Sequence, residues 1–402
     1  MSGHPHTLHA PKPERLVPSK FALTGIFAVV AIVGIILSVI GACVDRIQFV
    51  YSWFFAFYFF FSIALGSFFW VTLHHACNSG WGVLVRRVWE NVLALIPLFF
   101  VLFLPCCLPS SSGGFGGILW KYLTPENQAH LNHAQGWFSP MFFYVRVALY
   151  FIYFWLAGLY YYRSSVKQDT DGSPVHTRNM IDHSYLALVI FGVLETFLSF
   201  DWLMGLAWSW SSSLFGAYNF GLCVQAGMAT CIVLVAIFRS AGFLVALNSE
   251  HFYLMGKLLF GFTILWAYFA FGQYLLIWYA NIPEETIFYN DHNHHGWMYL
   301  CFLIVVGKFM FPVMYLLAQD TKKSLQALTA IAVWILFMHG IELYWFIMPY
   351  AHKATIIPNW QDIVSFLTVG SILGYAYIHV AARSSLFPTR DPRMVECLTV
   401  TN

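Results

Sequence analysis

Ten long runs of apolar residues, separated by short polar segments, dominate this chain of 402 residues. Each run has the length of about 20 residues that a helix needs to cross the hydrocarbon core of a bilayer. Charged residues make up only 9% of the chain, against about 25% in an average soluble domain. The sequence therefore predicts an all-α integral membrane protein with about ten transmembrane helices, and it excludes a soluble enzyme. The predicted spans are 21–43, 51–73, 92–108, 140–163, 184–206, 214–238, 253–280, 296–318, 326–349 and 361–383.

The segments outside the spans leave little room for a further domain. We expect an N-terminal tail over 1–20, a membrane domain over 21–383 and a C-terminal tail over 384–402. Pro312 is predicted to kink the eighth span, because a proline inside a helix removes one backbone hydrogen bond. An outer-membrane barrel would instead show short segments of alternating hydrophobicity.

Lys and Arg fall mainly on one side of the predicted topology. Fourteen lie on the side that carries both termini, and only Arg46, Lys121 and Lys353 lie in the opposite loops. An excess of these residues marks the cytoplasmic side of a membrane protein. The prediction is therefore a multi-pass protein with both termini in the cytoplasm. The N-terminal segment lacks the layout of a cleavable signal peptide, so the first apolar run is expected to remain as a span.

Six ionisable residues lie inside the predicted spans, where each would cost about 2.5–3.5 kcal/mol at the bilayer centre. We expect them to face the bundle interior, paired with one another or with buried water. One interpretation is that they form ion pairs that only fix helix register. The other is a proton path, because carboxyl and imidazole groups can exchange protons through internal water. This hypothesis names Glu195, Asp201, Lys308, His339 and Glu342 as the path, Arg146 and Lys257 as charge partners, and Tyr144, Tyr274 and Tyr344 as hydroxyl links.

The metal-binding side chains follow no redox-cofactor pattern. The eight cysteines include no Cys-x-x-Cys-His run for covalent haem and no ferredoxin-like spacing. A haem held by single histidines of two spans, such as His339 and His379, is an alternative that we do not favour. The loop residues Asp291, His292, His294 and His295 are conceivable metal ligands, but a solvated or subunit-contacting loop is the preferred interpretation. The same holds for His130 and His133, which are expected on a short interfacial helix.

Two stretches resemble a known family. One is Trp266-Ala-Tyr268 followed by Gln273-Tyr-Leu-Leu-Ile-Trp-Tyr-Ala-Asn-Ile-Pro-Glu-Glu-Thr286, and the other is Ser199-Phe-Asp-Trp-Leu-Met204 followed by Ser213-Leu-Phe-Gly-Ala-Tyr218. They resemble the NrfD-like (polysulfide-reductase-type) membrane subunits of alternative complex III, a bacterial quinol:cytochrome c oxidoreductase. The resemblance runs over most of the chain. With about 400 residues and short tails, the chain is similar to the smaller, F-type copy.

The resemblance implies an architecture and a set of partners. Spans two to five (51–206) and six to nine (214–349) would each form a four-helix bundle, with the first and last spans as flanking helices. The partners would be a larger NrfD-like subunit, an iron–sulfur subunit and haem c subunits, which would hold the redox centres. The location would be the bacterial inner membrane, surrounded by lipid. No nucleic-acid partner is implied, since the formal net charge is only +2.

The expected function is that of a membrane subunit without its own redox metal, which supports proton translocation and complex assembly and has no catalytic residues of its own. The alternative is a subunit that binds quinone, for instance menaquinone, in a cleft lined by Asp201, Trp202, Tyr218 and Tyr274. After Met204 the chain continues Gly205-Leu-Ala-Trp-Ser-Trp210, without a polar cluster for a quinone carbonyl, which favours the first expectation. A secondary transporter, which would show internal repeats, and a purely structural scaffold are further alternatives.

Overall fold

A computed structural model describes residues 11–18, 21–128, 136–292, 294, 296–352 and 355–401. In these ranges every regular element is helical, apart from one isolated bridge between Ser110 and Gly113. Ten of the helices described there are long and apolar enough to cross a membrane. The prediction of an all-α, multi-pass membrane protein is confirmed.

Eight of the spans are single helices, while the third and the eighth are each divided. The single helices are α1 (Ala22–Val44), α2 (Arg46–Ala76), α6 (Pro140–Asp171), α7 (Pro174–Trp202), α8 (Phe215–Ser240), α9 (Ser249–Ala280), α14 (Leu325–Ile347) and α15 (Trp360–Ala381). The third span consists of α3 (Val83–Leu93) and α4 (Ile96–Phe103), and the eighth of α11 (Trp297–Ile304), a π-helical turn (Val305–Met310) and α12 (Phe311–Leu317). Short helices outside the spans are α5 (Pro125–Gln128), α10 (Pro283–Asp291), α13 (Gln319–Lys323) and α16 (Met394–Leu398).

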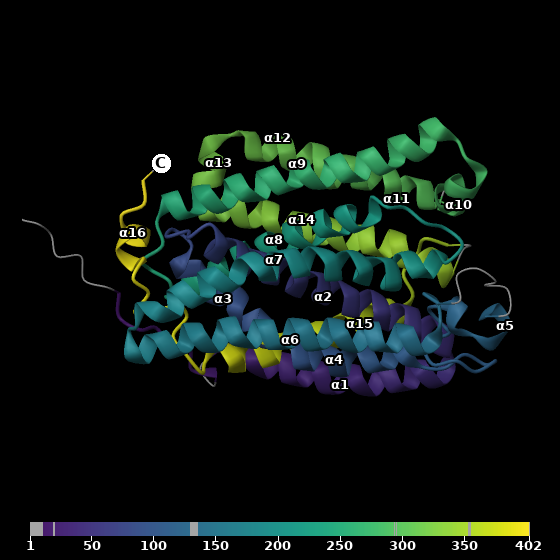
Figure 1. The fold of residues 1–402 in the computed structure, drawn as a ribbon, viewed down its shortest axis with the longest axis horizontal. Coiled ribbons are helices and arrows are strands. Elements are labelled where there is room, and N and C mark those ends of the chain that lie inside the picture. Colours follow the sequence, from purple (N-terminus) through teal and green to yellow (C-terminus); the bar gives the residue numbers. More distant parts are fainter. Residues whose placement is uncertain are drawn as a thin grey trace, which may run out of the picture.

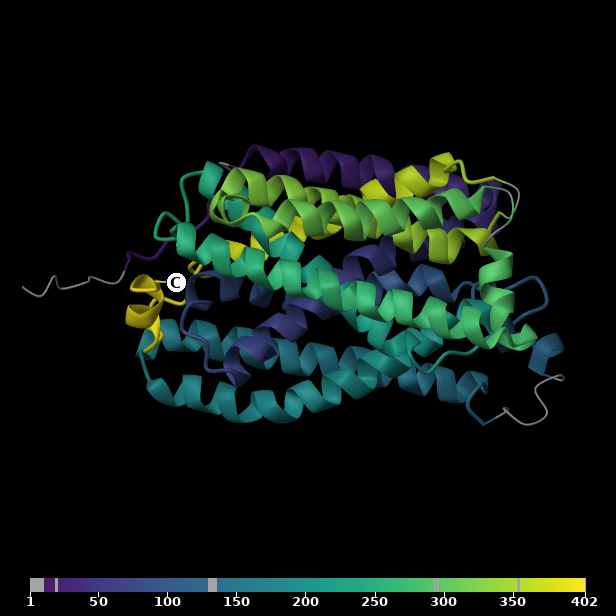
Figure 2. The same ribbon diagram turned by 90° about the horizontal axis from the view of Figure 1, so that it is seen from above.

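The helices pack as two bundles joined along one seam (Figures 1 and 2). In the first bundle, α2 packs against α3 and α7, and α6 packs against α3, α4 and α7. In the second, α8 packs against α9 and α14, while α9 packs against α12 and α11 against α14. The contact between α2 and α8 joins the two bundles, and α1 pairs with α15, which lies against α2. This is the predicted arrangement of two bundles with flanking first and last helices.

Two glycines allow the close approach of α2 and α8. A Cβ atom on Gly66 would lie 2.0 Å from the carbonyl oxygen of Cys223, and one on Gly227 would lie 2.7 Å from the carbonyl carbon of Gly66. Neither position can therefore carry a side chain without moving the helices apart. Small residues at such crossings let transmembrane helices pack backbone to backbone.

The third span starts earlier than predicted. We expected it to begin at residue 92, with Arg86 and Arg87 in a loop, but α3 begins at Val83 and both arginines are buried. The residues between the predicted fourth and fifth spans, 164–183, are also mostly helical. Helix α6 runs to Asp171 and α7 begins at Pro174, with only a two-residue turn at Gly172, whose φ of +67° suits glycine.

The eighth span is interrupted where Pro312 was predicted to disturb it. A π-helical turn precedes the proline, which has no N–H for the helical ladder and whose ring crowds the carbonyl four residues earlier. The indole Nε1 of Trp334 donates a hydrogen bond of 2.7 Å to the carbonyl oxygen of Gly307 inside this turn. Lys308 lies in the same turn, so the irregularity coincides with the charged residue of this span.

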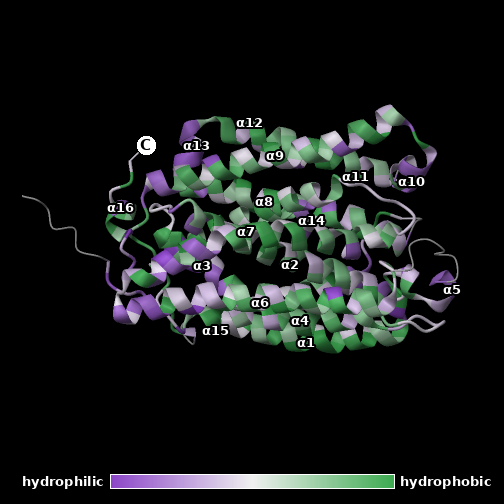
Figure 3. Ribbon diagram, viewed as in Figure 1, coloured by the Kyte–Doolittle hydropathy of each residue, from purple (hydrophilic) through white to green (hydrophobic). Residues whose placement is uncertain are grey.

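Hydrophilic residues gather at the two ends of the bundle, and most densely at the end where α2 finishes and α3 starts (Figure 3). We call this the charged end. The C-terminal segment after residue 384 packs against it, with Leu386, Phe387 and Cys397 fully buried. The amide of Leu386 also donates to the carbonyl oxygen of Glu14, so the two terminal segments meet there.

Candidate functional site

A group of buried polar side chains crosses the seam between the two bundles. We call it the central polar cluster, and each of its members is at most 6% exposed. Six spans contribute to it, which explains why no short sequence motif marks it. Its members are Tyr58 and Ser62 of α2, Glu195 of α7, Tyr218, Asn219 and Cys223 of α8, Trp266 of α9, Lys308 of the eighth span, and His339 and Glu342 of α14.

Glu342 has three donors from three different spans. Lys308 forms an ion pair with its Oε2, and the hydroxyl of Tyr218 donates to its Oε1. The indole Nε1 of Trp266 donates to the same Oε1 at 3.0 Å. The ammonium of Lys308 lies 4.6 Å from the centre of the Trp266 ring, which adds a cation–π contact. The carboxylate is therefore both neutralised and hydrogen-bonded in the interior.

Glu195 is held differently. The amide Nδ2 of Asn219 donates to its Oε1 at 2.7 Å, and the Oδ1 of Asn219 accepts from the hydroxyl of Tyr58 at 3.0 Å. No Lys, Arg or His in the described ranges lies within ion-pair distance of Glu195. Because an unpaired charge is costly to bury, an ionised Glu195 would be less well compensated than Glu342.

One nitrogen of His339 contacts Ser62. Its Nε2 lies 2.8 Å from the hydroxyl of Ser62, which also lies 2.8 Å from the carbonyl oxygen of Phe59. The other nitrogen of the imidazole is Nδ1. That atom is buried and has no hydrogen-bond partner within the described part of the chain. When Nε2 carries the ring hydrogen, His339 can therefore accept a proton or a water molecule at Nδ1.

Cys223 lies near both carboxyl groups of the cluster. Its sulfur lies 3.7 Å from the Nδ2 of Asn219, the donor to Glu195. The same thiol lies within electrostatic range of Glu195, Lys308 and Glu342, and His339 lies within range of Lys308. The predicted residues Glu195, Lys308, His339 and Glu342 are thus brought together. Tyr58, Ser62, Asn219 and Trp266 belong with them, although sequence reasoning assigned them no role in the path.

Asp201 is not part of this cluster. The guanidinium of Arg146 binds both of its oxygens, with Nε and Nη2 each at 2.7 Å, and the hydroxyl of Tyr150 donates to it at 2.7 Å. Arg146 also stacks over the rings of Trp137 and Phe142. Arg146 is the charge partner that we predicted. Its partner Asp201, which the hypothesis placed in the proton path, lies instead outside the central polar cluster.

Lys257 corrects a prediction. It is exposed on α9, with its ammonium 4.1 Å from the centre of the Tyr253 ring, and it pairs with no carboxylate in the described ranges. Its place near a helix end explains this, because a long side chain there can reach the membrane surface. The predicted hydroxyl links also lie elsewhere: Tyr144 donates to the carbonyl oxygen of Phe115, and Tyr274 packs against Tyr289. Tyr344 lies beside His352.

The residues of the alternative quinone cleft do not meet in one site. Asp201 is held by Arg146, Tyr218 by Glu342, and Tyr274 is 43% exposed on α9. Trp202 is fully buried and stacks on Phe103, with ring centres 4.6 Å apart. These four side chains therefore do not fit the predicted quinone pocket, and we derive no chemistry from it.

The metal candidates form no metal-binding group within the described part of the chain. In the described ranges, no three His, Cys, Asp or Glu side chains are grouped so that they could hold a metal ion. His292 is buried and its Nδ1 contacts the carbonyl oxygen of Phe288 at 2.6 Å, while His295 lies outside the described residues, as do His130 and His133. His379 is bonded to the carbonyl oxygen of Tyr375, and His339 to Ser62, so the two haem-ligand candidates have separate partners.

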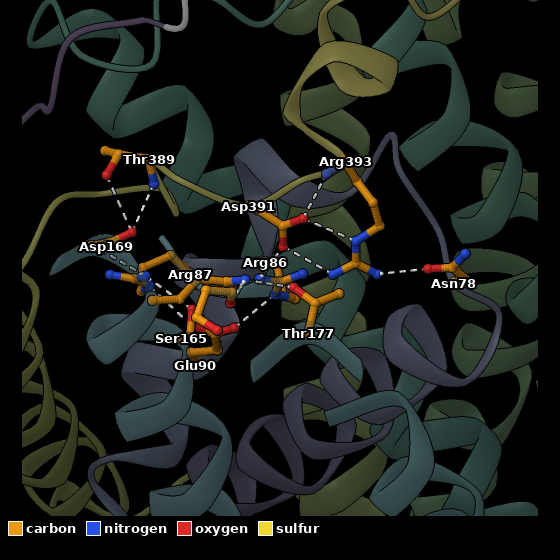
Figure 4. Close-up of polar contacts among 12 residues, drawn as sticks. Asn78, Arg86, Arg87, Glu90, Ser165, Asp169, Thr177, Thr389, Asp391 and Arg393 are labelled. Carbon is orange, nitrogen blue, oxygen red and sulfur yellow. Dashed lines mark hydrogen bonds and ion pairs between the residues drawn. The ribbon is translucent and has the colours of Figure 1, made fainter. Parts of the chain in front are cut away.

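A second polar group, at the charged end, was missed by sequence reasoning (Figure 4). Arg86 donates to Glu90 at 2.8 Å and to Asp391 at 3.0 Å, and Arg87 donates to Glu90 at 3.0 Å and to Asp169 at 3.1 Å. The spacings of three and four residues between the arginines and Glu90 are typical of ion pairs on one helix. That signal was available in the sequence, whereas nothing local indicated Asp391.

A scan against models of protein families and a search of curated proteins both found no match to this chain. The family resemblance and the function it implies therefore remain predictions. The fold and the geometry of the central polar cluster are independent of that resemblance.

Proposed function

We propose that the protein is the smaller, F-type NrfD-like membrane subunit of a bacterial quinol:cytochrome c oxidoreductase, in which it carries protons. The observation that carries this proposal is the central polar cluster. It contains two buried carboxyl groups and an imidazole, Glu195 from α7 and His339 and Glu342 from α14, each with its own polar partners from helices on both sides of the seam between the bundles.

The cluster contains three groups that can bind a proton, and protonation would have a different effect at each. Glu195 has no cation beside it in the described ranges, so a proton would neutralise it directly. A proton on Glu342 would cancel its attraction to Lys308, which lies in the π-helical turn. Protonation would therefore be coupled to the packing of the eighth span. The Nδ1 of His339 is buried without a partner in the described ranges, and it supplies a third place for a proton when Nε2 carries the ring hydrogen. Water between these groups would complete the path.

The remaining parts of the proposal rest on the family resemblance. Quinol oxidation would take place in partner subunits, and the partners would be a larger NrfD-like subunit, an iron–sulfur subunit and haem c subunits. The complex would lie in the bacterial inner membrane, with the charged end and both termini in the cytoplasm, in agreement with the distribution of Lys and Arg.

The test replaces one carboxyl at a time in the complete complex, reconstituted into sealed vesicles. Glu342→Gln and Glu195→Gln each keep the shape of the side chain and remove its capacity to carry a proton. We expect the number of protons moved per electron, followed with a pH-sensitive dye, to fall severalfold in both variants while haem content stays unchanged.

The matched control is Glu284→Gln on the exposed surface of α10, which should leave proton movement unchanged. Normal proton movement in both cluster variants, with intact electron transfer, would refute the proposed path. Cys223→Ser, which keeps a small polar group at this position of α8, is expected to retain most of the movement.

A further inference from the structure

Lys322 differs from the other buried basic side chains of the protein. Six Lys and Arg side chains are buried in the described ranges, and five of them form an ion pair with a carboxylate. The five are Arg86, Arg87, Arg146, Lys308 and Arg393. Lys322 is only 8% exposed, and it donates instead to the carbonyl oxygens of Leu316 and Leu317, at 2.6 and 3.2 Å. These carbonyls end α12, so the contact caps that helix, and it leaves one of the three N–H groups of the ammonium unused.

Two more lysines lie with Lys322 around the ring of Tyr253. The ammonium nitrogens of Lys257, Lys323 and Lys322 lie 4.1, 5.3 and 5.9 Å from the centre of this ring. Burial and the charge of Lys257 lower the pKa of Lys322, so the two ammonium groups repel each other. We call Lys257, Lys322 and Lys323 the lysine cluster.

The carboxylates near the lysine cluster compensate only one of its members. Glu250 forms an ion pair with Lys323 at 2.9 Å, and Asp320 lies within electrostatic range of the same lysine. Within the described part of the chain, no carboxylate forms an ion pair with Lys257 or Lys322. Two like charges that are held together without a counter-charge point to an anion that binds between them.

The position of Lys322 is fixed by the packing of two helices. The cluster lies at the charged end, where α9 packs against α13 (Figure 3). A Cβ atom on Gly256 of α9 would lie 2.8 Å from the Cγ of Lys322, so the stem of this lysine rests on the backbone of α9. With its stem packed and its ammonium bonded to α12, Lys322 pays little further entropy to bind an anion.

The depth of the cluster places it at the edge of the bilayer. Helix α9 has 32 residues and is about 48 Å long, so it exceeds the hydrocarbon core of about 30 Å and its ends stand in the headgroup layers. From Lys257 an exposed apolar face continues along α9 with Ile264 and Phe271. Between them, a Cβ atom on Gly261 would have no atom within 4 Å, so this face is open beside the lysines.

We propose that the lysine cluster binds the phosphate group of one anionic phospholipid, whose acyl chain lies along the exposed face of α9. The phosphate oxygens would accept hydrogen bonds from Lys257 and from the unused N–H of Lys322, and their charge would remove the repulsion between the two lysines. Basic sites between transmembrane helices bind such headgroups. Free phosphate offers the same oxygens, but only a lipid also covers the apolar face beside the cluster. This inference does not depend on the proposed proton path.

The test measures the phospholipid that the purified full chain retains in micelles, using native mass spectrometry. The probes are dioleoylphosphatidylglycerol, which is anionic, and dioleoylphosphatidylcholine, which has the same chains but no net charge. We expect the natural protein to retain the anionic lipid severalfold better, and this preference to weaken as salt screens the lysines. Lys257→Gln should abolish the preference, and Lys257→Arg should keep it. The matched control is Lys167→Gln, which removes the same charge from an exposed position on α6 and should change nothing.

Two further measurements distinguish other anions from a phospholipid. Inorganic phosphate, added as a competitor at the same ionic strength as a chloride control, should leave the anionic lipid bound; its displacement would show a site for free phosphate and overturn the proposal. Carbodiimide treatment of native membranes should not join Lys257 to another protein, and such a cross-link would show that an acidic protein segment occupies the cluster instead.

The lipid measurement can also contradict the proposal directly. Lys257 is exposed, so Lys257→Gln should elute from a sizing column at the same volume as the natural protein. Equal retention of the two lipids by the natural protein would overturn the proposal. So would an unchanged preference for the anionic lipid in the Lys257→Gln variant.

Discussion

Glu342 and Glu195 show that two carboxyl groups in one interior can be stabilised by different means. Glu342 has Lys308, a phenol and an indole around it, whereas Glu195 has a single amide donor. The sequence predicted that such residues face the interior, because lipid would penalise them. It did not predict which charges pair, since a position along a span indicates depth but not the direction in which the side chain points.

At the residue scale, Asp391 is expected to hold the C-terminal segment against α3 over a wide pH range. Burial alone would raise its pKa, but the charges of Arg86 and Arg393 and the hydrogen bonds from Arg393 outweigh burial and hold the pKa below its usual range. A carboxyl with a lowered folded-state pKa contributes stability above its unfolded pKa of about 3.9, and this is lost as pH falls through the folded value. Docking should therefore be constant between about pH 7 and 5.

Limited proteolysis with mass spectrometry of the C-terminal fragments checks this prediction. Asp391→Asn should make residues after 384 cleavable already at neutral pH, because Arg393 loses its counter-charge and Arg86 keeps only Glu90. Glu396→Gln, on the exposed side of α16, is the control and should stay protected. Release of the segment from the natural protein between pH 7 and 5 would contradict the role of Asp391.

At the element scale, hydropathy located all ten spans, and their pairing into bundles followed the family resemblance. The start of the third span was wrong because Arg86, Arg87 and Glu90 read as loop residues. Their charges are compensated by one another and by Asp391, which lies about 300 residues further along the chain. Local composition cannot show that a charge is neutralised by a residue far along the chain. The ends of helices are for this reason less predictable from sequence than their centres.

The crossing of α2 and α8 should be sensitive to the smallest added side chain. Gly66→Ala would place a Cβ atom 2.0 Å from a backbone oxygen, so the helices must move apart. We expect a loss of about 1–3 kcal/mol in unfolding free energy, the usual range for overpacking. The same substitution at Gly261 of α9, where no atom lies within 4 Å, should be neutral or stabilising by up to about 1 kcal/mol.

Reversible unfolding in mixed micelles gives both values. Because the helix-propensity gain from glycine to alanine is common to the two sites, their difference isolates the effect of the crossing. Equal stability of the Gly66→Ala and Gly261→Ala variants would show that the two helices are not held at this distance.

At the scale of the whole molecule, the distribution of Lys and Arg predicts which end faces the cytoplasm. Cys77 is exposed at the charged end, and Glu126 is exposed at the opposite end. In intact cells, a membrane-impermeant maleimide should label Glu126→Cys in a Cys43→Ser background, and should label Cys77 only after the membrane is opened. Labelling of Cys77 in intact cells would show that the charged end faces outward and that the predicted topology is wrong. The variant Cys77→Ser gives the background labelling.

The pairing of α1 with α15 has a consequence for how the protein is made. The ribosome completes the first helix long before the last one exists, and only Asp45 separates α1 from α2. Until α15 enters the bilayer, α1 lacks the neighbour that receives most of its contacts. Folding of the membrane domain is therefore completed only when α15 packs against α1. A substitution near residue 368, where Thr368 lies against Gly34, should first become visible as misplacement of α1.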